Sequence, residues 1–308
     1  MRNHKWLKGL ILFFFLSTVG IGVEWKKIKE SYELAQIVKK DEECEVKADE
    51  KEKRLLHLYE EKKEEEARKL EKEIREDFGK IIELYEEFLS LYPNNKKAWN
   101  FLGLLYFQRL KDPERAKECW EKALSIDPNY APALNNLSTY YSHTGNHLQS
   151  IKLIQKAIEN NPNVAVYHFN LSLYYFLFRY EVKEKLGWSL EEIFWKAIEE
   201  GEKARNLDPT NFDFAKHVAE LYRFAPYFGV NPSSVKVIQE WEKVLKIAKT
   251  PQQKGYVYLN IGRIYAIMGE KEKAIQAFEK AKVYQPSPGI DKWLEKLKNG
   301  KNKASPTR

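Results

Sequence analysis

The sequence predicts an all-α protein built as an α-α solenoid, and two observations carry this prediction. The stretch Tyr256–Pro286 places large and small residues at helical spacing on two successive helices, with Gly269 at the turn between them. The same spacing recurs along the chain with a period of about 34 residues. Because one helix pair cannot bury its own apolar face, this recurrence predicts a stack of pairs.

The spacing itself is aromatic-x2-L-G-x2-Y, then A-x3-F, then P. In the last unit it is carried by Tyr258, Ile261, Gly262, Tyr265, Ala274, Phe278, Ala281 and Pro286. Over roughly residues 78–297 the chain resembles tetratricopeptide-repeat proteins, with about five full repeats plus caps. The resemblance implies a right-handed superhelix of antiparallel helix pairs with a concave peptide-binding surface. It implies no particular partner, because this scaffold serves many.

The units follow in chain order. An incomplete unit around Ile81–Pro93 caps the array, and five full units begin with the helices that contain Trp99–Tyr106, Leu134–Tyr141, His168–Tyr175, Ala215–Tyr222 and Tyr258–Tyr265. The third unit carries an insertion around Glu181–Ser189, and the fourth has a longer loop. Thr250–Gln253 is a capping box that starts the last unit. Ile290–Leu297 is a closing helix.

The N-terminus combines a basic region, residues 1–8, with an uncharged run that ends at Val23. Trp6 and Trp25 bracket this run, as aromatic residues do at the two surfaces of a bilayer. We expect residues 9–25 to form a retained single-pass transmembrane anchor. A cleaved signal peptide is the alternative, since the uncharged run is short for a bilayer. The basic residues on the two sides nearly balance, and we expect the soluble domain to be exported to a periplasmic or other extracytoplasmic space.

Residues 26–77 form a charged linker or long helix between the anchor and the repeats. The first part of its charge-dense tract, from Lys39, has almost nothing to bury and is expected to be disordered. From Leu55 onward apolar residues return at helical spacing, which predicts an exposed spacer helix. A coiled-coil dimerisation segment is the alternative. Residues 298–308 are expected to be a disordered tail.

Composition excludes several classes of function. The net charge of +7 is spread along the chain in alternating basic and acidic blocks, so we expect no nucleic-acid partner. Cys44 and Cys119 are too few for a disulfide scaffold or a four-cysteine zinc site. His143 and His147 are separated by a predicted turn, which does not favour a metal pair. No catalytic motif, metal site or cofactor is expected.

The candidate site is the concave wall, built in such arrays by positions 2, 5, 9, 12 and 13 of each first helix. The partner-binding residues predicted in this way are Asn100, Leu104, Phe107, Asn135, Thr139, Phe169, Leu173, Phe176, Lys216 and Arg223. The third unit's wall is strongly apolar. It is expected either to bind a peptide or to be covered by Leu186–Trp195. Leu104 and Val166 replace the asparagine and lysine with which some relatives clamp a C-terminal carboxylate, so that clamp is not expected.

These expectations combine into a non-enzymatic, membrane-anchored adaptor or scaffold of a cell-envelope assembly. Its partner would be a protein or peptide with an apolar or amphipathic segment. The alternative is a structural accessory subunit of a secretion, pilus or envelope-biogenesis complex that acts through the long helix of residues 55–88.

Overall fold

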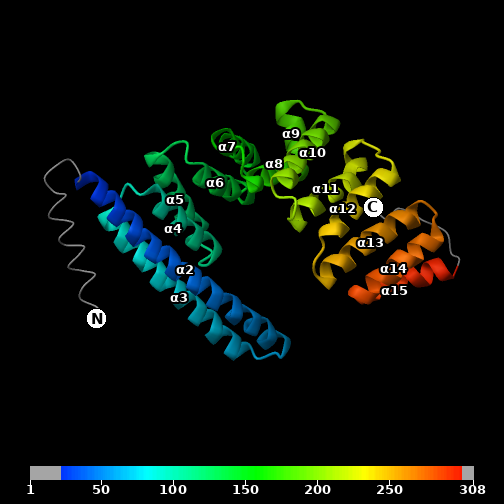
Figure 1. The fold of residues 1–308 in the computed structure, drawn as a ribbon, viewed down its shortest axis with the longest axis horizontal. Coiled ribbons are helices and arrows are strands. Elements are labelled where there is room, and N and C mark those ends of the chain that lie inside the picture. The colour runs from blue at the N-terminus through cyan, green and yellow to red at the C-terminus, as the bar shows by residue number, and fades with distance from the viewer. Residues whose placement is uncertain (1–21, 300–308) are drawn as a thin grey trace. The chain divides into compact units, whose positions relative to one another are not determined.

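The computed structural model describes residues 22–299, and every regular element within that range is a helix (Figure 1). The chain divides into two compact units, Met1–Tyr140 and Tyr141–Arg308. The all-α prediction is therefore confirmed for the described part of the chain, while the right-handed winding stays a prediction.

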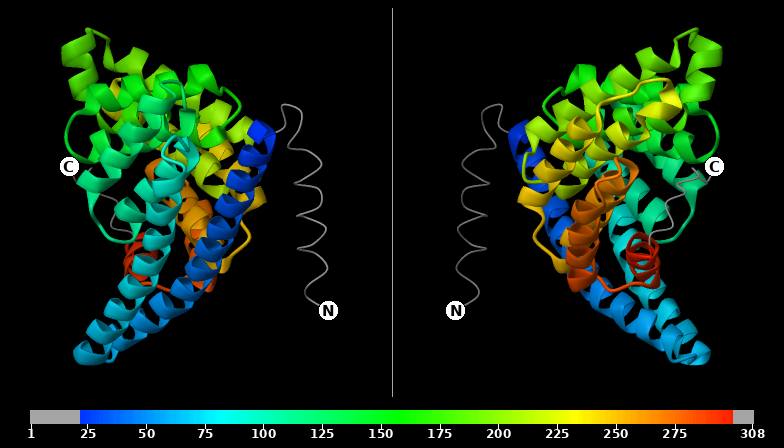
Figure 2. Two further views of the ribbon diagram at one scale, coloured as in Figure 1. Left: turned by 90° about the vertical axis from the view of Figure 1, so that its left-hand side faces the viewer. Right: turned by 90° about the vertical axis from the view of Figure 1, so that its right-hand side faces the viewer.

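The first unit begins with two long helices, α2 (Gly22–Glu60) and α3 (Glu64–Leu91). They pack against each other as an antiparallel hairpin, which Figure 1 shows from the side, and in Figure 2 they diverge from the turn that joins them. The chain turns at Lys62, whose φ is 59°. Polar contacts join the two helices away from the turn: Lys51 Nζ lies 2.7 Å from Asp77 Oδ2, and the hydroxyl of Tyr85 donates to Asp41 Oδ2 at 3.3 Å.

This hairpin corrects the prediction for residues 26–77. The tract from Lys39 is helical rather than disordered, and the turn at 61–63 divides what the sequence suggested as one long helix. The apolar stripe is buried within the hairpin, where Leu58, Ala67 and Leu70 form a cluster. Packing against α3 and α4 stabilises α2, which local composition does not reveal.

The rest of the first unit is α4 (Lys96–Gln108), α5 (Pro113–Ile126) and most of α6 (Ala131–His143). The side chain of Asn95 caps α4 by accepting from the Ala98 amide, and Asp112 caps α5 by accepting from the Arg115 amide. Arg109, directly after α4, donates to Glu45 at 3.0 Å and to Glu52 at 2.8 Å. These ion pairs hold α2 along α4 as well as along α3.

The second unit continues the helix pairs, with one added helix. Its elements are α7 (His147–Asn160), α8 (Ala165–Leu177), α9 (Arg179–Leu186), α10 (Leu190–Leu207), α11 (Phe212–Phe224), the short 3-10 helix η1 (Ala225–Phe228), α12 (Ser234–Ile247), α13 (Pro251–Ile267), α14 (Lys271–Tyr284) and α15 (Pro288–Lys298). The insertion predicted around Glu181–Ser189 contains α9, and Ser189 with Glu192 forms a capping box that starts α10.

The end of the array follows the prediction closely. The capping box of Thr250 and Gln253 starts α13, and Gly269 forms the turn before α14 with a φ of 78°. The closing helix α15 buries Ile290, Leu294 and Leu297 against α14. Lys298 is the last residue of α15, so the predicted tail begins later than expected. Residues 300–308 lie outside the described range.

Small residues stand where two helices of a pair cross. A methyl group added to Gly103 would lie 2.5 Å from Nε1 of Trp120, and one added to Gly262 would lie 2.9 Å from the ring of Phe278. Ala123 and Ala281 are fully buried at the matching crossings. In these two helix pairs the aromatic ring of the second helix therefore packs onto the glycine of the first, as the spacing predicts.

Among the helices described in residues 22–299, none is long and apolar enough to cross a membrane. The predicted anchor, residues 9–25, lies outside the described range except for its last four residues, and it stays a prediction.

Candidate functional site

The predicted site residues of the first unit lie on α4 and α6, and they differ in how much surface they leave for a partner. Asn100 is only 4% exposed: its Oδ1 accepts from Asn136 Nδ2 at 2.9 Å, and its carbonyl accepts from Trp120 Nε1 at 3.3 Å. This arrangement leaves Asn100 little surface for a partner, which a register count along one helix does not reveal. Leu104, Phe107, Asn135 and Thr139 are partly exposed.

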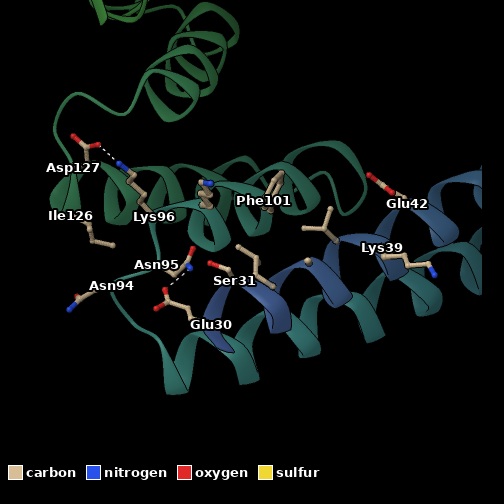
Figure 3. A pocket seen from close by; sticks show the side chains of 14 residues that line it. Glu30, Ser31, Lys39, Glu42, Asn94, Asn95, Lys96, Phe101, Ile126 and Asp127 are labelled. Atoms are coloured by element: carbon tan, nitrogen blue, oxygen red, sulfur yellow. Dashed lines mark hydrogen bonds and ion pairs between the residues drawn. The ribbon is translucent and has the colours of Figure 1, made fainter. Parts of the chain in front are cut away.

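Figure 3 shows a groove of about 890 Å³ in the first unit, between α2 and the start of α4. Leu34, Val38 and Phe101 supply its apolar lining. Two pairs of its polar residues contact each other: Asn95 Nδ2 donates to Glu30 Oε1 at 2.7 Å, and Lys96 pairs with Asp127. None of the predicted site residues lines this groove, because α2 was not expected to pack here.

In the second unit, Phe169, Leu173 and Phe176 share one partly exposed face of α8, as predicted. The ring of Phe169 lies 5.1 Å from that of Phe214 on α11, and Phe176 lies 5.6 Å from Phe224. The apolar wall of α8 therefore continues onto α11.

The structure places residues of α11 and η1 against this wall. Trp188 of the insertion lies 5.9 Å from Tyr175, on the packing side of α8. The ring neighbours of Phe176 are instead Phe224 and Phe228, from α11 and η1. Two apolar side chains beside them remain open, with Leu177 51% exposed and Tyr227 60% exposed. Side chains of the next repeat, on α11 and η1, thus shield part of the wall, and the rest of the wall is accessible.

The predicted cations of α11 differ in their environment. Lys216 is paired with Asp213 at 2.7 Å. The guanidinium of Arg223 lies 4.0 Å from the centre of the Phe224 ring, and among the described residues its buried Nε has no hydrogen-bond partner. Lys216 is therefore already neutralised, whereas Arg223 is held by an aromatic ring.

A second arginine lies close to Arg223. Arg263 occupies α13, the next first helix along the array. Burial lowers the pKa of the Arg263 guanidinium, and the positive charge of Arg223 lowers it further. The hydroxyl of Tyr256 on α13 donates to Glu220 on α11 at 2.5 Å, which joins the two helices that carry these arginines. Burial and then this hydrogen bond raise the pKa of Tyr256 to about 12.

Arg263 was not among the predicted site residues, because the concave positions were assigned only in the first four repeats. The repeat spacing was sufficient to assign Arg263 to a concave position. Counted from Tyr258, Arg263 stands at the position of the last unit that corresponds to Glu220 in the fourth.

A buried serine–histidine pair joins three helices of the second unit. Ser172 Oγ donates to the carbonyl of Ala197 at 2.6 Å and lies 2.8 Å from His217 Nε2. Burial, assisted by the charge of Lys216, lowers the pKa of His217 to about 4. Both side chains are buried, and the contacts tie α8 to α10 and α11.

His147 is not placed as a metal ligand. Its Nδ1 lies 2.5 Å from Glu181 Oε2, and its ring stacks on Phe178 at 3.8 Å. Within residues 22–299, no three histidine, cysteine, aspartate or glutamate side chains gather as a metal site would require.

Sequence models of one repeat family match the chain in three places: residues 96–130, 119–152 and 255–287, each described as tetratricopeptide repeat. These segments coincide with α4–α5, the junction of α5 with α6 and α7, and α13–α14. The chain contains tetratricopeptide repeats.

Two curated relatives match this chain over 84 and 62 residues. The human mitochondrial import receptor subunit TOM70 is 32% identical over 84 residues, which covers 27% of this chain and 14% of TOM70. The uncharacterized protein ycf37 of Porphyra purpurea is 37% identical over 62 residues, which covers 20% of this chain and 35% of ycf37. The chain thus spans well under half the length of these relatives.

Two solved structures share the solenoid fold. YrrB, described as a TPR protein with an unusual peptide-binding site, gives a TM-score of 0.52 at 16% identity and covers 69% of this chain and 97% of its own. Pseudomonas aeruginosa pilF gives a TM-score of 0.51 at 16% identity and covers 83% and 98%. At this identity the likeness shows the tetratricopeptide-repeat fold and nothing about partners.

Proposed function

We propose that this chain is a non-enzymatic adaptor that binds a peptide segment of a protein partner on the first helices of its second unit. The proposed surface, here called the inner face, consists of Phe169, Leu173, Phe176, Leu177, Lys216, Glu220, Arg223, Phe224, Tyr227 and Arg263. The observation that carries the proposal is the aromatic wall of α8, which continues onto α11 and leaves Leu177 and Tyr227 open.

Binding energy at protein interfaces is concentrated in a few residues. Aromatic side chains in a sheltered patch dominate affinity, because they bury much area at a low cost in conformational entropy. Phe176 is braced by Phe224 and Phe228, and the guanidinium of Arg179 lies 5.6 Å from the Phe176 ring. Such a patch is already ordered before a ligand arrives, and preorganisation favours binding.

The first unit offers less surface for binding a partner than the second unit does. Asn100 is buried, and four polar residues of the groove in Figure 3 are paired with each other, Asn95 with Glu30 and Lys96 with Asp127. We therefore place the principal binding surface on the inner face, with Leu104, Phe107, Asn135 and Thr139 as secondary contacts.

Anchoring to a membrane is part of the proposal and rests on the sequence alone. The uncharged run within residues 9–25, bracketed by Trp6 and Trp25, would hold the repeats at a membrane surface, with the soluble domain exported for a cell-envelope assembly. The full-length protein should then stay with membranes through an alkaline carbonate wash. A mature chain that begins near Ile21 and appears in the soluble fraction would overturn this part.

The alternative, a structural accessory subunit of a secretion, pilus or envelope-biogenesis complex acting through residues 55–88, has less support. Apolar residues of this segment pack inside the α2–α3 hairpin, where Leu58 and Leu70 are buried. The hairpin surface that remains carries many charged side chains together with the exposed side chains of Leu56 and Tyr59.

The inner face can be tested without knowing the natural partner. Wild-type protein would be used to select binders from a phage-displayed library of random dodecapeptides, and the enriched peptides would be measured by fluorescence anisotropy. We expect Leu177→Ala with Tyr227→Ala to weaken binding at least tenfold, because both side chains are exposed and their loss leaves the core intact.

The matched control is Val235→Ala with Val283→Ala, which removes two exposed apolar side chains from the second helices α12 and α14. Peptides that bind both double variants as tightly as wild type would refute the proposed surface.

A further inference from the structure

Two arginines of the inner face lack the acidic partners that most of its other charges have. Lys216 is paired with Asp213, and Glu220 is engaged by the Tyr256 hydroxyl. Within residues 22–299, neither Arg223 nor Arg263 forms an ion pair, and Nε of Arg223 is buried without an acceptor. Both side chains are partly buried rather than free in solvent.

The positions of Arg223 and Arg263 destabilise the protein when no ligand is bound. Arg223 stands on α11 one turn after Glu220, and Arg263 stands on α13 two turns after Tyr256. The Tyr256–Glu220 hydrogen bond joins these two helix faces, so the guanidiniums lie on adjoining faces of α11 and α13. Burial lowers the pKa of Arg263, and the charge of Arg223 lowers it further, as expected of like charges held near one another.

Glu220 does not relieve this repulsion. Its carboxylate accepts from Tyr256 at 2.5 Å, and neither guanidinium donates to it. Arg223, with its unpartnered Nε, therefore lies against Phe224, whose ring is 5.6 Å from that of Phe176 and 6.0 Å from that of Tyr227. Arg263 adds a second guanidinium from the adjoining helix α13. Paired, planar donors of this kind suit a carboxylate, which accepts two parallel hydrogen bonds from a guanidinium.

We propose that Arg223 and Arg263 form an acid-binding subsite of the inner face, which accepts the side-chain carboxylate of an Asp or Glu in a bound peptide that also carries an aromatic residue. The inference rests on the proposed peptide-binding function and specifies its ligand. Charge complementarity supplies the acidic residue, and the adjoining aromatic patch supplies the place for the aromatic one.

The peptide selection described above separates the two proposals. Wild-type protein should enrich peptides that combine Asp or Glu with Phe, Tyr or Trp. The variant Arg223→Gln with Arg263→Gln should lose the enrichment of acidic residues and keep that of aromatic ones. Leu177→Ala with Tyr227→Ala should do the reverse. Aromatic enrichment without acidic enrichment on wild type would overturn the subsite alone, whereas no enrichment dependent on the inner face would overturn the proposed function.

A control keeps general charge effects apart from the subsite. Lys249→Gln with Lys292→Gln removes two exposed positive charges from elsewhere in the second unit. It should leave the acidic enrichment unchanged, because screening weakens charges at a distance. Loss of the enrichment in this control would show a diffuse charge effect and overturn the subsite.

Binding constants give the decisive comparison. The best selected peptide and a version with its Asp or Glu changed to Asn or Gln would be measured against wild type and the double arginine variant. We expect the amide peptide to bind wild type at least tenfold more weakly and to bind the arginine variant as well as the acidic peptide does. Independent, additive effects of the two changes would overturn the inference.

Two further peptides identify the source of the anionic group. One ends at the acidic position and offers an α-carboxylate after an amide side chain, and the other carries phosphoserine in place of Asp or Glu. We expect both to bind more weakly than the internal acid, and tenfold tighter binding of either would overturn the choice of a side-chain carboxylate.

Removal of the repulsion also gives a readout independent of peptides. The single variant Arg263→Gln should melt at a higher temperature than wild type in the absence of ligand. A lower melting temperature would show that Arg263 stabilises the fold and would contradict its assignment to a ligand.

Discussion

The indole of Trp120 packs directly onto Gly103, so closely that a methyl group at Gly103 would lie 2.5 Å from Nε1. This contact fixes the spacing of α4 and α5, and the same relation between Gly262 and Phe278 fixes α13 and α14. In these two repeats the helix crossing is thus defined by a missing side chain on one helix and a large ring on its partner.

Gly103→Ala should therefore destabilise the protein by about 1–3 kcal/mol, because the ring of a fully buried tryptophan has to move. Gly79→Ala is the matched control: Gly79 is also within a helix, but nothing lies within 4 Å of the added methyl group. That change should stabilise by about 0.5–1 kcal/mol. Chemical denaturation of both variants measures this, and an unchanged stability of Gly103→Ala would argue against the crossing.

Glu240 lies in a buried ion cluster and should make the free energy of unfolding depend on pH in the acidic range. Burial alone would raise the pKa of this carboxyl. Hydrogen bonds from Lys236, Lys243 and Arg205, each at 2.8 Å, outweigh burial and lower the pKa to about 2. A pKa below the ordinary 4.5 means that this stabilisation is present above pH 4.5 and is lost as the pH falls through 2.

Glu240→Gln should accordingly lower the free energy of unfolding by about 2–4 kcal/mol at pH 7, with the difference from wild type shrinking below pH 4.5. Glu242→Gln, an exposed neighbour on the same helix, should change stability by less than about 0.5 kcal/mol. A Glu240 effect that stays constant from pH 7 to pH 2 would show that charge plays no part in it.

His217 should make the free energy of unfolding depend on pH in a higher pH range than Glu240 does. Its pKa is lowered to about 4 from 6.5 by burial, so the folded state disfavours the protonated ring. Stability is therefore full above pH 6.5 and falls as the pH is lowered from 6.5 towards 4, by up to about 3 kcal/mol in total. In His217→Gln this part of the pH profile should disappear, while His57→Gln, which removes an exposed histidine, should retain it. Identical profiles for wild type and His217→Gln would count against the assignment.

Arg109 should secure α2 to the repeats. It pairs with Glu45 and Glu52, and its guanidinium lies 4.8 Å from the Phe78 ring. Arg109→Gln should speed amide hydrogen exchange in the middle of α2 at least tenfold and leave α13 and α14 unaffected. Arg54→Gln, an exposed arginine of α2, serves as the control. Unchanged exchange in α2 would mean that packing against α3 alone holds the helix.

The repeat helices could be predicted from sequence because their signals are local. Glycine at the crossing, an aromatic residue on the second helix and residues such as Asn95 and Asp112 at helix starts each act within a few residues. The path of α2 could not be predicted in this way. Its buried residues, including Leu34, Ile37 and Ala48, are sparse among charges, and they are buried by partners distant in sequence.

The candidate site was predictable to the level of helix positions and no further. Register correctly placed Phe169, Leu173 and Phe176 on one face, yet it also selected Asn100, which Asn136 holds in the interior. Neither the bond from Tyr256 to Glu220 nor the proximity of Arg223 and Arg263 follows from periodicity, because each joins residues of different repeats.

The binding claim is tested most directly by site-specific photo-crosslinking with the tightest selected peptide. A benzophenone side chain placed at Leu177 or at Tyr227 should form a covalent adduct with the peptide on irradiation. The same group at Val283, which is 80% exposed on α14, should form none. Adducts at positions 177 and 227 alone are the predicted result, and adducts at 283 without any at 177 or 227 would contradict binding on the inner face.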